Sequence, residues 1–147
     1  MGGIKKPLGF VIVVALVLLG CSTVALATWP MPTWTVDIVN ELSNGQELFV
    51  HCKSKDDDLG EHNLDSGAQY GFTFKDNVWQ TTLFWCYLRK PDNSHAAFDV
   101  YWYDISKGHW LYTRCDYKNC IWIAKADGIY IKNIPSNQDE LVHPWEN

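Results

Sequence analysis

Short segments in which apolar and polar residues alternate run through most of this 147-residue chain. Turn signals separate the segments at spacings of about 8–12 residues, which is typical of an all-β domain. From residue 28 onward, no stretch carries apolar residues at helical spacing over three turns. The pattern therefore predicts a small antiparallel β-sandwich of seven or eight strands. The expected strands cover residues 34–40, 48–53, 69–75, 80–88, 97–103, 110–115, 120–126 and 129–132.

Three segments indicate how the strands are arranged. Asn44-Gly45 stands between the first two strands, and because this dipeptide is a strong hairpin signal we expect these strands to be antiparallel neighbours. Segment 80–88 has apolar residues on both faces, which is typical of a central strand. Residues 133–147 contain two prolines and several acids, and we expect an irregular tail there.

Residues 1–27 have the features of a secretory signal peptide. Two lysines precede an unbroken apolar run at residues 10–19, and a small-residue cleavage motif ends at Ala27. We expect cleavage after Ala27, export, and one domain over residues 28–147. The ten-residue apolar run is well below the roughly 20 residues that cross a bilayer, so no membrane insertion is expected. Cys21, in Leu-Leu-Gly-Cys, is an alternative lipoprotein signal.

The mature chain keeps four cysteines, an even number in a secreted domain, and this predicts two disulfides that staple the sandwich. Four thiols can pair in three ways, and the sequence does not choose among them. Because a bridge across a longer loop constrains the unfolded chain more, we expect two long-range bridges. No Cys-x2-Cys spacing indicates a zinc or dithiol redox site. The four residues are Cys52, Cys86, Cys115 and Cys120.

Charge and histidine placement argue against nucleic-acid binding and against catalysis. Without the two leader lysines, ten basic residues face 17 acidic residues, a net charge of −7 that disfavours contact with a phosphate backbone. The five histidines are scattered, with no pair at the spacing of a zinc protease, and no serine lies in a Gly-x-Ser-x-Gly motif. We therefore expect no enzyme activity and no cofactor.

Three consecutive aspartates at residues 56–58 follow the strand that carries Cys52. Calcium prefers oxygen ligands, but these aspartates lack the alternating spacing of a calcium loop. Because Lys53 and Lys55 lie beside them, a solvated turn with local ion pairs is the favoured interpretation. No metal site is expected.

Eight tryptophans raise the possibility of sugar stacking. Most of them occupy alternating strand positions beside other apolar residues, which favours a place in the core. Trp79 and Trp110 lie next to turns, and we expect these two to be exposed. A secreted carbohydrate-binding or defence module is therefore the alternative function.

Four sequence blocks occur in order across nearly the whole mature chain, at residues 39–42, 48–60, 82–86 and 120–130. The second contains His-Cys-Lys-Ser and Asp-Asp-Asp-Leu-Gly, and the last reads Cys-x-Trp-x-Ala followed by Asp-Gly-Ile-Tyr. Together they resemble the plant self-incompatibility S-protein family, whose members are also called S-protein homologues. The resemblance implies a small secreted plant β-sandwich with two disulfides. It also implies a ligand-like role, because the founding members are pistil-side ligands that a pollen receptor recognises.

The expected function is therefore that of a secreted ligand, monomeric, for an unidentified cell-surface protein receptor. Loops on a rigid scaffold commonly carry recognition, and we expect loops 55–60, 89–94 and 104–109 to supply it. The last of these combines mixed charge with an adjacent tryptophan. Within it the expected contact residues are Asp104, Lys107 and His109.

Overall fold

The computed structural model describes residues 30–147, and the predicted signal peptide lies outside this range. The described residues form nine strands and one short helix, so the all-β prediction is confirmed with one strand more than expected. The elements are β1 (Thr33–Glu41), β2 (Leu48–Ser54), β3 (Asp58–Leu64), β4 (Gln69–Lys75), β5 (Leu83–Arg89), β6 (His95–Trp102), α2 (Trp110–Arg114), β7 (Asn119–Lys125), β8 (Gly128–Asn133) and β9 (Gln138–His143).

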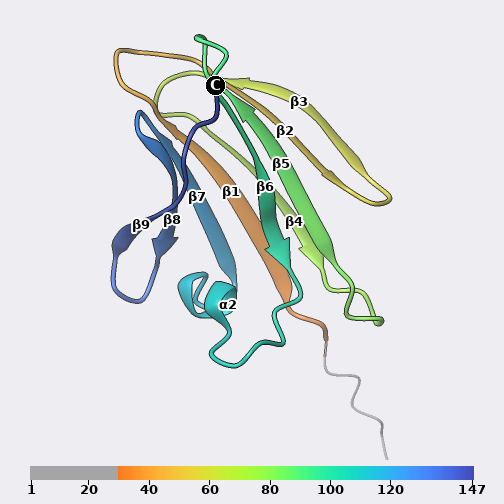
Figure 1. The fold of residues 1–147 in the computed structure, drawn as a ribbon. Coiled ribbons are helices and arrows are strands. Elements are labelled where there is room, and N and C mark those ends of the chain that lie inside the picture. Colours follow the sequence, from red (N-terminus) through yellow and green to blue (C-terminus); the bar gives the residue numbers. More distant parts are fainter. Residues whose placement is uncertain (1–29) are drawn as a thin grey trace, which may run out of the picture. The chain divides into compact units, whose positions relative to one another are not determined.

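The strands form two sheets that pack as a β-sandwich (Figure 1). Strand order is β4-β1-β7-β8-β9 in the five-stranded sheet and β3-β2-β5-β6 in the four-stranded sheet. All paired strands are antiparallel except β1 and β7, which run parallel. The predicted antiparallel sandwich is thus confirmed with one parallel pair. β5 lies inside its sheet, as the apolar faces of segment 80–88 predicted.

Apolar side chains from alternate strand positions fill the space between the sheets. Val36 and Ile38 of β1 and Val50 of β2 are fully buried. Phe74 of β4 packs against Phe84 of β5, with ring centroids 4.5 Å apart. We call the two packed sheets the body. Because burial of an apolar side chain of this size contributes roughly 1.5–3 kcal/mol, this core supplies most of the stability of the body.

The expectation that the first two strands are neighbours is wrong, because β1 and β2 lie in different sheets. Asn44 and Gly45 do form a tight turn, with φ of 60° and 67°. The buried Asn40 explains the departure, since its Nδ2 donates to the carbonyls of Gln46 and Leu64 at 2.8 and 2.9 Å. These hydrogen bonds replace a strand ladder where the chain crosses between sheets.

Two further differences concern short or exposed elements. Segment 110–115 is the one-turn helix α2 rather than a strand, and a single turn is too short to show helical periodicity. Residues of the expected tail form β9, which pairs with β8. β9 and the unanticipated β3 are both edge strands, and their exposed polar side chains conceal the alternation that marks inner strands.

Candidate recognition site

Loops that are distant in sequence meet at one end of the sandwich. In the four-stranded sheet, the register places the end of β2, the start of β5 and the end of β6 together. In the other sheet, it places the start of β1, the end of β4 and the start of β7 together. Helix α2 and the β4–β5 loop lie at this end (Figure 1). We call residues 55–57, 76–82 and 103–118 the loop end.

The structure brings two of the three expected contact loops to the loop end. Loop 104–109 lies there, as do the first residues of loop 55–60, whose last three residues belong to β3. Loop 89–94 lies at the other end of β6, where the next residue, His95, pairs with Glu146 near the C-terminus. The three loops therefore do not form one surface.

Exposed apolar side chains are concentrated at the loop end. Trp79 is 81% exposed and Trp110 is 36% exposed, which confirms the predicted exposure of both. Loop 76–82, which contains Trp79, was not selected from the sequence, although a tryptophan beside a turn was the available signal. Of the eight exposed large apolar residues in the described chain, seven belong to the loop end or border it: Met31, Val78, Trp79, Leu83, Ile105, Trp110 and Tyr117. Exposed apolar residues that gather in one region are typical of interaction surfaces, which makes the loop end the candidate recognition site.

Asp104 organises the loop before α2. Its side chain is only 4% exposed. Oδ1 accepts from the backbone N–H and the hydroxyl of Ser106, and Oδ2 accepts from the backbone N–H of Leu111 at 3.0 Å. Burial raises the pKa of the Asp104 carboxyl, but these hydrogen bonds outweigh burial and the pKa lies below its ordinary value. The geometry gives Asp104 a structural role in the loop.

Lys107 and His109, the other two expected contacts, are exposed. The Nδ1–H of His109 donates to the backbone carbonyl of Asp104 at 2.9 Å, which orients the imidazole ring. His109 also has a positive φ of 44° at the start of α2. Receptor contact by these residues stays a prediction.

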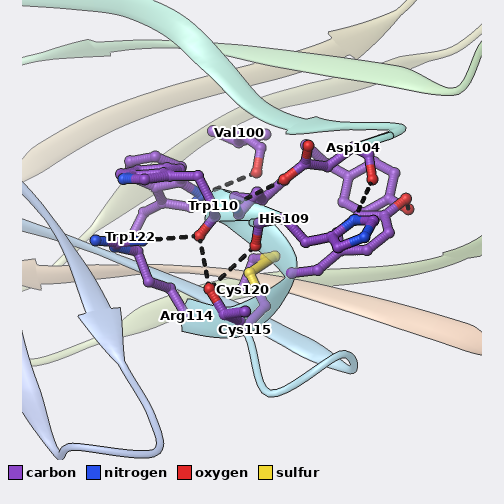
Figure 2. The surroundings of a disulfide bond; sticks show 12 residues. Val100, Asp104, His109, Trp110, Arg114, Cys115, Cys120 and Trp122 are labelled. Atoms are coloured by element: carbon purple, nitrogen blue, oxygen red, sulfur yellow. Dashed lines mark hydrogen bonds between the residues drawn. A yellow bond between two sulfur atoms is a disulfide. The ribbon is translucent and has the colours of Figure 1, made fainter. Parts of the chain in front are cut away.

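The Cys115–Cys120 disulfide closes the end of α2 onto β7 (Figure 2). Together with the Cys52–Cys86 bridge between β2 and β5, it confirms the predicted two disulfides. The expectation of two long-range bridges is wrong, because this pair is separated by five residues. The backbone N–H of Asn119 donates to the carbonyl of Cys115 at 2.8 Å, so the reversal already holds the two cysteines together.

A stacked arrangement of side chains covers the outer side of α2. The Trp102 and Trp110 rings are nearly parallel, with centroids 6.0 Å apart, and the Arg114 guanidinium lies 4.4 Å from the Trp110 centroid. Arg114 also forms an ion pair with Glu140 of β9. Beside this helix, the Trp122 indole N–H donates to the carbonyl of Val100 at 2.9 Å (Figure 2). These contacts fix α2 against both sheets.

At the β2–β3 turn, Asp58 accepts a 2.6 Å hydrogen bond from His51 and lies 3.7 Å from the Lys53 ammonium. The hydrogen bond from His51 and the backbone N–H of Gly60 lower the pKa of Asp58 below its ordinary value. This is the expected solvated turn with local ion pairs. Within residues 30–147, no group of three or more His, Cys, Asp or Glu side chains is arranged to hold a metal ion.

A polar hollow of about 500 Å³ lies between the β2–β3 turn and the β4–β5 loop. The exposed Trp79 lines it, together with the strand residue Trp85. Asp56, Asp57 and Asn77 supply polar groups at the same hollow. An aromatic ring beside carboxylate and amide groups is able to contact a sugar ring and its hydroxyls.

Comparison with known proteins places this fold in a family. The family model described as "Plant self-incompatibility protein S1" matches residues 35–145. The chain belongs to the plant self-incompatibility protein S1 family. The family resemblance in the four sequence blocks is thereby confirmed. Three of those blocks lie mainly on β1, on β5 and on β7 with β8, so the scaffold rather than the loop end carries most of the resemblance.

Several S1-family relatives cover most of this chain. S-protein homolog 1 of Arabidopsis thaliana is 47% identical over 113 residues, which cover 77% of this chain and 72% of the relative. S-protein homolog 74 of the same plant is 42% identical over 114 residues, covering 78% of this chain and 72% of the relative.

One solved S1-family structure shares the fold, with a TM-score of 0.61 and 22% identity over 80% of this chain and 98% of that chain. It is titled as one of the SPH (Self-Incompatibility Protein Homologue) proteins, "a widespread family of small, highly stable, secreted proteins from plants". The expected secretion agrees with this description of the family. No helix among residues 30–147 is long and apolar enough to span a bilayer.

Proposed function

We propose that this S1-family protein is a monomeric extracellular ligand that presents its loop end to a cell-surface protein receptor. The receptor acts in self-pollen rejection or in related signalling between plant cells. The observation that carries the proposal is the gathering of seven exposed apolar side chains at one end of a disulfide-braced sandwich. Protein interfaces place aromatic and apolar groups at their centre, with polar residues around them.

The arrangement of the loop end also suits recognition. Loop 104–109 is fixed from within by Asp104, while Lys107 and Ile105 point to solvent and are free to differ among relatives. A loop held in one conformation loses less entropy on binding than a flexible loop does. Differences in the exposed residues would then change the choice of receptor without changing the fold.

Exchange of loops tests the proposal. The purified secreted protein would be titrated onto membranes from pollen and from other plant cells, and compared with a variant in which residues 55–57, 76–82 and 104–109 come from a relative. We expect the exchange to weaken binding at least about tenfold, the effect of losing one or two hot-spot residues. Exchange of loop 89–94 at the opposite end is the matched control and should leave binding within about twofold. Sedimentation would report the oligomeric state of each variant.

Equal loss from the control exchange, or undiminished binding after exchange at the loop end, would refute the proposal. The same titration on membranes of several tissues would separate pollen rejection from other signalling. Binding confined to pollen membranes would support the first role, and binding to vegetative membranes would support the second.

A carbohydrate-binding or defence role is the second candidate function, and the hollow beside the exposed Trp79 favours it. A glycan array with the secreted protein tests it. Saturable sugar binding that is lost in Trp79→Ala and kept in Trp110→Ala would support a site in this hollow. Loss in Trp110→Ala alone would move the sugar to the face of α2, and an array without saturable binding would remove this candidate.

A further inference from the structure

A second hollow of about 580 Å³ lies at the loop end, between the β4–β5 loop and α2. It differs from the polar hollow beside Trp79 in having aromatic rings at five of its eleven lining residues and no lysine among them. No lysine or arginine lines it, and its one carboxylate belongs to Asp76. The principal lining residues are Trp34, Asp76, Tyr103, His109, Tyr112 and Tyr117.

The aromatic wall is organised around Tyr112 of α2. The Trp34 ring lies 4.6 Å from the Tyr112 ring, centroid to centroid. The Tyr103 and Tyr117 rings are inclined to the Tyr112 ring by 87° and 66°, with centroids 6.3 and 6.0 Å from it. His109 lies parallel to Tyr112 at 6.0 Å. Ring faces carry partial negative charge, so several rings around one hollow attract a cation.

Asp76 adds a full negative charge to this wall. Its carboxylate accepts from the Trp34 indole Nε1–H at 3.1 Å and from the Tyr101 hydroxyl at 2.8 and 3.0 Å. Burial, together with the hydrogen bonds to Tyr112 and Asp76, raises the pKa of Tyr101, so this hydroxyl stays a neutral donor. Within residues 30–147, Asp76 forms no ion pair.

We infer that the hollow walled by Trp34, Asp76, Tyr103, Tyr112 and Tyr117 binds a guanidinium group. A carboxylate without a cationic partner, set among tyrosine and tryptophan rings, is complementary to an organic cation. A guanidinium fits better than an ammonium. It is planar, is weakly hydrated, stacks on aromatic faces and can still donate to a carboxylate in the plane of the group.

The group could be the arginine side chain of a protein or a free small guanidine, and the two present the same chemistry to the hollow. Tyr117 is 54% exposed and Val78 is 76% exposed at the rim, so the hollow is reached from solvent. The inference stands apart from the receptor proposal, because a short peptide tests it and no receptor is needed.

Titration of the secreted protein, followed by the indole N–H resonance of Trp34, tests the inference. The probes are the peptide acetyl-Gly-Arg-Gly-amide, the same peptide with uncharged citrulline in place of arginine, and methylguanidine as a free guanidine with a single charge. We expect the arginine peptide to shift the Trp34 resonance saturably, and the citrulline peptide to bind at least about tenfold more weakly, since the charge is lost.

Three variants locate the site. Asp76→Asn keeps the shape of the side chain and should weaken binding of the arginine peptide about tenfold or more. Tyr117→Ala removes a ring that is 54% exposed, so we expect the variant to fold and to bind the arginine peptide about two- to fivefold more weakly. Asp65→Asn removes the same charge from an exposed turn outside the hollow and should leave the affinity unchanged.

The outcomes separate clearly. Stronger binding of the arginine peptide than of methylguanidine assigns the site to a protein side chain, and equal or stronger binding of methylguanidine assigns it to a free guanidine. Equal binding of the arginine and citrulline peptides, or no saturable shift of the Trp34 resonance, overturns the inference. So does a Tyr117→Ala variant that is folded and binds the arginine peptide with unchanged affinity.

Discussion

The two disulfides brace two regions of the sandwich in different ways. Cys52 and Cys86 are paired residues of the inner strands β2 and β5, 34 residues apart in sequence. Cys115 and Cys120 lie five residues apart, at the junction of α2 and β7. In the chain-entropy model the first bridge contributes roughly 4 kcal/mol and the second roughly 2 kcal/mol. The first therefore stabilises the body, and the second mainly fixes the shape of the loop end.

The same contrast holds for the backbone. In the body, backbone N–H and C=O groups form hydrogen bonds with neighbouring strands. At the loop end, side chains such as those of Asp104 and Thr113 form hydrogen bonds with backbone groups instead. Four non-glycine residues there, Gln80, His109, Asp116 and Tyr117, have positive φ values, which residues with a side chain rarely adopt. The body thus depends on a repeated pattern, and the loop end depends on single residues.

Removal of each disulfide tests this contrast and should give the largest effects. We expect the double variant Cys52→Ala with Cys86→Ala to lower the free energy of unfolding by about 4 kcal/mol. The variant Cys115→Ala with Cys120→Ala should lower it by about 2 kcal/mol. Guanidinium denaturation of the secreted protein measures both. A loss from the second variant as large as that from the first would contradict the division between body and loop end.

Two glycines offer a sharper comparison. A Cβ atom at Gly128, where β7 turns into β8, would lie 2.7 Å from the backbone oxygen of His143 and 2.6 Å from a Leu141 methyl. Gly128→Ala should therefore destabilise the body by about 2 kcal/mol through overpacking.

Gly108 at the loop end has a φ of +91° and no atom within 4 Å of an added Cβ. Gly108→Ala should cost about 1 kcal/mol, from backbone conformation alone. Thermal unfolding of the two variants measures the difference. A cost at Gly108 that exceeds the cost at Gly128 would contradict the expectation that overpacking in the body costs more than backbone strain at the loop end.

Asp104→Asn measures how much one carboxylate in the loop end contributes to the free energy of unfolding. We expect a loss of about 1–2 kcal/mol at neutral pH, since the backbone donors of Ser106 and Leu111 lose a charged acceptor. The folded-state pKa of Asp104 is lowered, so its contribution is complete above the ordinary aspartate pKa and is lost as pH falls through the lowered value.

The difference in unfolding free energy between Asp104→Asn and the unmodified protein should therefore shrink below about pH 4. Urea denaturation at a series of acidic pH values measures it. A difference that stays constant through this range would show that the Asp104 carboxylate adds nothing beyond its neutral form.

Trp79→Ala should have the smallest effect on stability, within about 0.5 kcal/mol, because the side chain is mostly solvated. Trp122→Ala, in the core, is the matched comparison and should cost about 3–5 kcal/mol. Denaturation midpoints measure both variants. A large loss from Trp79→Ala would mean that this ring packs against the protein, which would argue against its place on a recognition surface.

Much of the body could be predicted from the sequence. Period-two alternation is local, so the inward faces of strands such as β1 and β5 were readable from residues such as Val36, Ile38 and Cys86. The two disulfides followed from four cysteines in an exported chain. The exposure of Trp79 and Trp110 followed from their positions beside turns.

The pairing of strands and cysteines could not be predicted in the same way. Asn44-Gly45 forms the predicted turn, but β1 and β2 do not pair across it. Asn40 instead donates to backbone carbonyls where the chain crosses to the other sheet. Cys115 and Cys120 are brought together by a one-turn helix that no periodicity reveals. Asp104 is a charged residue in a loop, and for that reason the sequence suggested a contact residue. Only the structure shows that its side chain is buried within its own loop.

The sequence by itself determined the class of this protein: an exported, aromatic-rich, disulfide-bonded β domain of the S1 family. Tertiary structure alone decided which loops share an end, which carboxylates stay accessible, and where rings gather around Tyr112 and Asp76. The physical reason is the sequence separation of the residues that interact. Alternation and turn chemistry act between near neighbours, whereas a recognition surface is set by strand register between residues tens of positions apart.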